Sequence, residues 1–235
     1  MTVVFGTLSG KGGAGKSTLV TLLAGEYASY DKKVLLVDAD PSQNLAAWWR
    51  LSEEKENQPE NVDLASVLQR QQLAELLDRK KAAYDVVIID TAGRESIFGA
   101  SIIGHCDLVL TPIQASKREI DAAGTAAQHV AEFNAEHGTD ISQLIVRTRV
   151  ALTSKSLEAY SFIRPFVEAL RNSGAPSILL ETELMERNVY RNIQNGYGSV
   201  QMQDLTEPVI KARREIMSLV KEIDSHLPPN MRKAA

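Results

Sequence analysis

A glycine-rich stretch near the N-terminus strongly constrains the fold of this chain. Residues 10–18 read Gly-Lys-Gly-Gly-Ala-Gly-Lys-Ser-Thr, which matches the G-x-x-x-x-G-K-S pattern of a phosphate-binding loop. One apolar run, residues 3–8, precedes the stretch and another, residues 19–24, follows it. This order predicts a strand, a phosphate loop and a helix, the opening unit of an α/β protein.

The residue types of this loop suit a chain of phosphates. Glycines let successive backbone N–H groups turn toward one anion, and the following helix adds the positive end of its dipole. We expect Lys16 to reach the β- and γ-phosphates and the Ser17 hydroxyl to ligate Mg²⁺. The alternative is a glycine turn that binds nothing. The predicted nucleotide-binding residues are Gly12, Gly13, Ala14, Gly15, Lys16, Ser17 and Thr18.

Lys11 follows the first glycine and is not needed to hold phosphate. A second lysine so close to Lys16 is electrostatically unfavourable unless the two share an anion. The octapeptide K-G-G-A-G-K-S-T resembles the deviant Walker A motif of the ParA/MinD partition ATPases. The resemblance implies a homodimer that sandwiches ATP, in which Lys11 reaches the phosphates bound by the other subunit. The alternative for Lys11 is an exposed lysine on a loop.

Two carboxylates follow a second apolar run, at Asp38-Ala39-Asp40-Pro41. Open α/β sheets place ligands at the C-terminal edge of their strands, where this segment should lie. By the family resemblance, Asp40 orients or activates the attacking water and Asp38 supports the metal shell. The catalytic candidates are therefore Lys11, Lys16 and Asp40. A helix N-cap before Pro41 is the alternative interpretation of Asp40.

A third buried run, residues 84–90, ends at Asp90 and reads as a Walker B strand. Its aspartate would bind Mg²⁺ through water, so the expected metal residues are Ser17, Asp38 and Asp90. After Asp90 the sequence differs from the D-x-P-P motif that is common in the family. It continues Thr91-Ala92-Gly93-Arg94, in which Gly93 could sense the γ-phosphate and Arg94 is more typical of a solvated loop.

Apolar periodicity extends the α/β pattern along the chain. It predicts helices at residues 17–29, 43–51, 63–83, 119–136, 156–172 and 206–227, and further strands at 33–38, 84–90, 108–113, 141–149 and 177–180. Pro112 should end the fourth strand. We therefore expect a P-loop NTPase fold, in one domain over residues 1–235. In this fold a doubly wound, mostly parallel sheet carries helices on both faces.

The distribution of charge, the single cysteine and the lengths of the apolar runs limit which partners and which protein classes fit this chain. Residues 1–146 hold 13 Lys and Arg against 20 Asp and Glu, whereas residues 147–235 hold 13 against 10. Any polyanion should therefore contact the C-terminal third. For the DNA binding that the family resemblance implies, we expect contacts from Arg187, Arg191, Lys211, Arg213 and Arg214. A solvated helix face is the alternative for each of them. The single cysteine, Cys106, excludes a disulfide framework and should be a core residue. No run of about 18 apolar residues predicts a membrane span.

The resemblance covers nearly the whole chain, and it looks closest to the VirC-type protein of T-DNA transfer. It implies a cytoplasmic, nucleoid-associated ATPase without a helix-turn-helix extension. Its ATP-bound dimer would bind double-stranded DNA nonspecifically and leave it on slow hydrolysis of ATP with Mg²⁺, stimulated by a ParB-like or cargo adaptor protein. By position only, Arg147, Thr148 and Arg149 are candidates for the adenine pocket.

Two other classes remain open at this point. A MinD-like membrane-positioning ATPase would need a terminal amphipathic helix free to enter a bilayer interface. The last predicted helix instead looks packed against the core, and we expect no stable membrane insertion. A metabolic P-loop enzyme that activates a carboxylate or amide is a further alternative, although such enzymes generally lack the equivalent of Lys11.

Overall fold

The computed structural model describes residues 1–9, 13–92 and 101–231. Within them, seven parallel strands form one sheet in the order β3-β2-β4-β1-β5-β6-β7. The strands are β1 (Val3–Thr7), β2 (Val34–Ala39), β3 (Val62–Ser66), β4 (Val86–Thr91), β5 (Leu108–Ile113), β6 (Ser142–Arg147) and β7 (Ser177–Leu179). The chain passes from β1 outward to β2 and β3, returns to β4 between β2 and β1, and from β5 on continues outward on the other side. The strand order therefore reverses beside β1, and open α/β sheets bind ligands at the carboxyl ends of their strands at such a point.

Continuous burial explains why the central strands form. Every residue of β1, β2, β4 and β5 is buried, as expected for parallel strands covered on both faces. Their apolar side chains divide between two layers. Phe5 and Ile88 belong to the core on one face, and Val4 and Ile89 belong to the core on the other.

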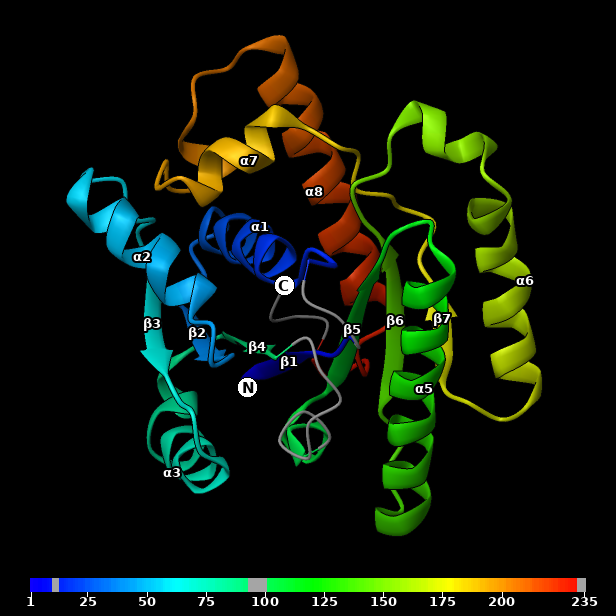
Figure 1. Cartoon of the computed structure of the whole chain (residues 1–235). Helices are drawn as coiled ribbons and strands as arrows, with labels where there is room; N and C mark the ends of the chain where they lie inside the picture. The colour runs from blue at the N-terminus through cyan, green and yellow to red at the C-terminus, as the bar shows by residue number, and fades with distance from the viewer. Residues whose placement is uncertain (10–12, 93–100, 232–235) are drawn as a thin grey trace.

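Helices cover both faces of the sheet (Figure 1). Helices α1 (Lys16–Ala28), α2 (Asn44–Glu54), α7 (Asn188–Gln194) and α8 (Glu207–Ser225) pack on one face. Helices α3 (Arg70–Lys80), α5 (Lys117–His137) and α6 (Glu158–Asn172) pack on the other. The predicted doubly wound fold is confirmed.

Local signals set the ends of α5. The Ser116 hydroxyl accepts a hydrogen bond from the Glu119 N–H (3.4 Å) before the first turn. At the other end, Gly138 adopts a left-handed conformation (φ 65°) and its N–H donates to the Asn134 carbonyl. These two caps lie close to the predicted bounds of 119 and 136.

The predicted helix over residues 63–83 is wrong in its first part. Residues 62–66 form β3, which pairs in parallel with β2, and the helix begins only at Arg70. Leu64, Val67 and Leu68 fit a helical spacing, but Leu64 also fits an alternating pattern with Val62 and the exposed Asp63. Pairing with the otherwise open edge of β2 selects the strand.

The structure also tests the predictions for Pro112 and Cys106. Pro112 does not end its strand, because β5 includes it and pairs it with Val146 of β6. Cys106 is buried in the core as predicted, and burial raises the pKa of its thiol. Among the described residues, no helix combines the length and apolarity needed to span a bilayer.

Candidate functional site

The phosphate loop joins the end of β1 to the start of α1 at the carboxyl edge of the sheet. Gly13 and Gly15 have φ angles of 94° and 92°, which side chains other than hydrogen rarely allow. Gly15 precedes the first turn of α1 and has no side chain to cap it, so the helix N-terminus is open to an anion. Gly10, Lys11 and Gly12 lie outside the described residues, as do Gly93 and Arg94.

Lys16 is a buried cation at this edge. Its side chain is 5% exposed, and Nζ donates a hydrogen bond to the Ser9 hydroxyl (3.0 Å). Burial lowers the pKa of Lys16, while the negative charges of Asp90, Asp40 and Glu119 oppose that shift. The charges of three acids thus favour the ammonium form of Lys16, and a phosphate chain would add further compensation for its burial.

Asp90 at the end of β4 has one carboxylate oxygen without a hydrogen-bond partner. The residue is fully buried, and Oδ1 accepts from the Thr7 hydroxyl (3.3 Å) while Oδ2 accepts from no described group. Burial raises the pKa of Asp90 to about 6, and a hydrogen bond from Ser17 and the charge of Lys16 counter the rise. An unpaired buried oxygen is costly unless something pairs with it.

This arrangement fits Mg²⁺. The Ser17 hydroxyl and the Asp90 carboxylate are close enough to interact, and hard oxygen donors are the ligands that Mg²⁺ prefers. No cluster of three or more His, Cys, Asp or Glu side chains suited to a metal occurs in the described part of the chain. A Mg²⁺ site with few protein ligands is typical where substrate phosphates and water complete the shell.

Asp38 is buried at the end of β2, and its place in the metal shell stays a prediction. Its two oxygens accept hydrogen bonds from the backbone N–H groups of Asp40 (3.1 Å) and Ala46 (2.8 Å). Burial raises the pKa of Asp38, and these backbone bonds oppose the rise. The carboxylate therefore ties the end of β2 to the first turn of α2 and holds the backbone of Asp40.

Asp40 is partly exposed at the same edge. Its Oδ1 accepts from the Ser42 N–H (2.8 Å), which closes a local turn. Helix α2 begins only at Asn44 and its N-cap residue is Gln43, so Asp40 is not a helix cap. The influence of its charge on the pKa of Lys16 places Asp40 near the phosphate loop.

Two side chains form hydrogen bonds to carbonyl groups of the phosphate loop, and the sequence did not predict these contacts. Gln114 Nε2, just after β5, donates to the Gly13 carbonyl (2.9 Å). The Thr148 hydroxyl, just after β6, donates to the Ala14 carbonyl (2.9 Å) and is buried. In the sequence, the only feature that points to these contacts is a polar residue directly after a buried strand. By its position alone, Thr148 is predicted to lie in the adenine pocket.

A pocket of about 300 Å³ adjoins the phosphate loop through Thr18. Its other walls come from the segment after β6 and from residues around α7, namely Arg149, Met185, Glu186, Arg187, Tyr190, Arg191, Gln194 and Asn195. Arg149 therefore lies beside the N-terminal part of α1, and its φ of 49° is unusual for a residue with a side chain. Its role in an adenine pocket stays a prediction. The pocket has the concave, mixed polar and apolar character of a small-molecule site.

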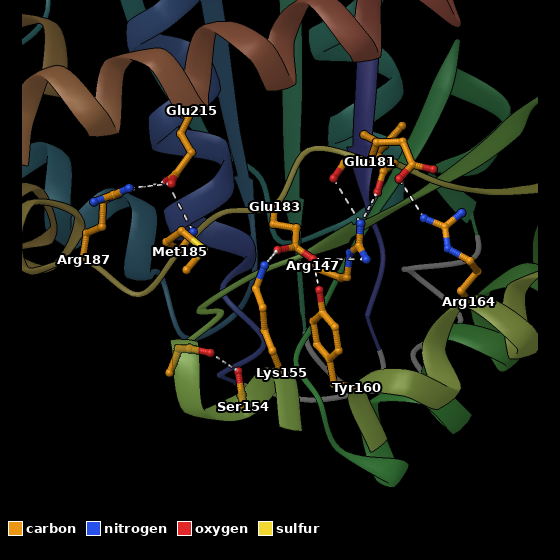
Figure 2. A network of polar contacts seen from close by, with 12 residues as sticks. Arg147, Ser154, Lys155, Tyr160, Arg164, Glu181, Glu183, Met185, Arg187 and Glu215 are labelled. Carbon is orange, nitrogen blue, oxygen red and sulfur yellow. Dashed lines mark hydrogen bonds and ion pairs between the residues drawn. The ribbon is translucent and has the colours of Figure 1, made fainter. Parts of the chain in front are cut away.

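Arg147 points away from this pocket. Its guanidinium donates to the carbonyls of Leu180 (3.0 Å) and Glu181 (3.1 Å) and forms an ion pair with Glu183 (3.1 Å) (Figure 2). Lys155 (2.7 Å) and the Tyr160 hydroxyl also contact the Glu183 carboxylate. Arg147 is therefore part of a structural network and is not placed to read a base.

The five predicted DNA contacts do not form one free basic surface. Arg187 makes two hydrogen bonds to Glu215, Arg191 pairs with Glu186, and Lys211 pairs with Glu207 (2.7 Å). Arg213 donates to three backbone carbonyls, those of residues 200, 201 and 203. Arg214 is exposed and makes no ion pair within the described ranges. Arg187 and Arg191 instead line the pocket beside Thr18.

Comparison with known proteins agrees with this geometry. A model of the VirC1 protein family matches residues 1–218. Protein ParA of Rhizobium radiobacter is 29% identical over 182 residues, which are 77% of this chain and 78% of the relative.

Solved structures share the fold at 18% identity. McdA from Cyanothece, solved as a variant in complex with ATP, gives a TM-score of 0.70 and covers 94% of this chain and 96% of its own. The septum site-determining protein MinD from Pyrococcus horikoshii, complexed with Mg-ADP, gives 0.69 and covers 95% and 97%. The chain therefore belongs to the VirC1 protein family, whose fold is that of the ParA/MinD-type partition ATPases.

Proposed function

We propose that this protein is a Mg²⁺-dependent ATPase whose ATP-bound dimer binds DNA and releases it after hydrolysis. The observation that carries the nucleotide part is the unpaired Oδ2 of buried Asp90 beside Ser17 and Lys16, at an open helix N-terminus. Each of these features is costly alone and becomes favourable when a metal-bound polyphosphate occupies the site. Relatives named ParA and the VirC1 family support a partition or positioning role.

The chain's own residues divide the chemistry between them. Loop N–H groups and Lys16 hold the phosphates, and Ser17 and Asp90 hold Mg²⁺, which when bound offsets charge on the phosphoryl group. Asp40 orients the attacking water, and Asp38 acts through Asp40 by fixing its backbone. The neighbouring pocket takes the base, with Arg149 and Met185 on its walls.

The dimer part of the proposal depends on Lys11. Its position in the octapeptide supports contact with the phosphates bound by the second subunit. Lys11→Ala should leave nucleotide affinity largely intact and abolish the ATP-dependent dimer, measured by light scattering after size exclusion. A Lys11→Ala protein that still dimerises fully with ATP would remove the sandwich from the mechanism.

The DNA part of the proposal relies on exposed cations of α8. Arg214 and Lys221 are exposed, and the exposed pair of Lys211 with Glu207 is weak enough to exchange for a phosphate. Phosphate contacts are independent of sequence and sensitive to salt, and two copies in a dimer add avidity. A cytoplasmic, nucleoid-associated protein with a ParB-like or cargo adaptor that stimulates hydrolysis is the corresponding cellular role.

The direct test is binding to nonspecific duplex DNA at several salt concentrations, with ATP, ADP or no nucleotide. Binding that requires ATP and falls steeply with salt supports the proposal, and Asp40→Ala should trap that bound state. No binding in any state would contradict the DNA role and leave the ATPase. Liposome pelleting with ATP is the control for the membrane alternative, which the buried apolar face of α8 disfavours.

A further inference from the structure

We propose that Glu215 of α8 is a positioning residue that sets the shape of the base end of the nucleotide site. This inference rests on the proposed function, because it takes the pocket beside Thr18 as the place where the base binds. Glu215 does not line that pocket. It acts through three residues that do.

Glu215 contacts several residues of the segment that follows β7, and Figure 2 shows its contacts with Arg187 and Met185. Its Oε2 accepts from the Met185 N–H (3.3 Å), from Arg187 Nε (3.0 Å) and from the Tyr190 hydroxyl (2.7 Å), and its Oε1 accepts from Arg187 Nη2 (2.6 Å). Met185, Arg187 and Tyr190 all line the pocket. One carboxylate from the last helix thus holds a backbone, a guanidinium and a phenol that are distributed along residues 185–190.

The geometry of this contact is demanding. The guanidinium of Arg187 meets the carboxylate through two hydrogen bonds, the arrangement that fixes both position and plane. Hydrogen bonding to Glu215 raises the pKa of Arg187, and both side chains are largely buried. Without the carboxylate, Arg187 would face the like charges of Arg149 and Arg191 across the same pocket, and its orientation would change.

Helix α8 also supplies a matched control. Glu222 lies two turns after Glu215 on the same helix face and accepts from the N–H groups of Glu181 (2.6 Å) and Thr182 (2.8 Å). It therefore holds the same connecting segment through hydrogen bonds of similar length. Neither Glu222 nor its partners line the pocket.

The experiment compares ATP with inorganic tripolyphosphate, each with Mg²⁺, by calorimetric titration. Tripolyphosphate uses the phosphate loop alone, so a change confined to ATP reports on the base pocket. Glu215→Gln should weaken ATP binding about 10-fold and leave tripolyphosphate binding unchanged, since it breaks a charge-assisted contact that only the base end needs. Glu222→Gln should change neither.

The outcomes separate this inference from the proposed function. Equal loss of ATP and tripolyphosphate affinity in Glu215→Gln, or no loss of either, would overturn the positioning role. Wild-type protein that binds the two ligands equally would overturn it as well, while retaining the phosphate loop. Wild-type protein that binds neither would defeat the proposed function itself. If Glu215→Gln does not fold, Tyr190→Phe removes one of the same hydrogen bonds and should lower ATP affinity alone, by a few-fold.

Discussion

Two regions of this protein differ in how many partners their buried charged groups have within the protein. At the phosphate loop, Asp90 keeps one buried oxygen without a partner, and Lys16 is a buried cation at a helix N-terminus without a side-chain cap. In the segment that follows β7, Glu183 receives Arg147, Lys155 and Tyr160. There most charged groups have partners within the protein (Figure 2), although the buried Nε of Arg147 has no hydrogen-bond partner among the described residues.

The difference indicates which region should gain more stability when a ligand binds. A buried polar atom without a partner destabilises the folded state, and the binding of a complementary group recovers that cost. A network in which most polar groups are paired contributes to stability and to a defined geometry instead. Substitutions in the first region should therefore affect binding, and those in the second should affect folding.

The largest expected effect is on binding at Lys16. Lys16→Met keeps the length of the side chain and removes its charge, so ATP affinity should fall about 100-fold through loss of a charge-assisted phosphate contact. The free energy of unfolding without nucleotide should change little, because the loss of the attraction to Asp90 is offset by removal of a desolvated charge. Calorimetric titration and urea denaturation measure the two quantities. A clear loss of stability in the nucleotide-free variant would break the contrast between the regions.

The next effect is on stability at Glu183. Glu183→Gln leaves Arg147 buried without its counter-ion, and we expect about 2 kcal/mol less free energy of unfolding, less than for a fully buried pair because the site is partly solvated. Urea denaturation measures this loss. Glu181→Gln is the matched control, because its pair with Arg164 is exposed and should contribute nothing measurable. Equal effects of the two substitutions would contradict the role assigned to the network.

The smallest effect concerns the brace at Thr148. Thr148→Val removes the hydrogen bond to the Ala14 carbonyl, which is worth about 1 kcal/mol, so ATP affinity should fall about fivefold as the loop loses its preferred conformation. Thr125→Val is a suitable control, since that hydroxyl bonds only to the α5 backbone. Unchanged ATP affinity in Thr148→Val would show that the loop holds its shape without this brace.

Sequence reasoning succeeded where a pattern is local. The strand and helix on either side of the glycine-rich stretch, the position of the aspartates at the ends of β2 and β4 and most helices and strands were predicted from neighbouring residues. Strand burial and helix periodicity depend on short stretches of chain. It failed at residues 62–66, where a short segment fits two periodicities. Pairing with β2 decided that case.

By itself, the sequence determined the α/β class, and it predicts polyphosphate chemistry at residues 10–18. Only the tertiary structure decided which charged residues are available for contact. Arg187 and Arg213 read as surface cations in the sequence, yet the first is held by Glu215 and the second by backbone carbonyls. Glu215 lies 28 residues from Arg187 along the chain, and Thr148 lies 134 from Ala14. The winding of the sheet brings such pairs together. A pattern of neighbouring residues therefore cannot show that a charged side chain is already paired with a residue distant in the sequence.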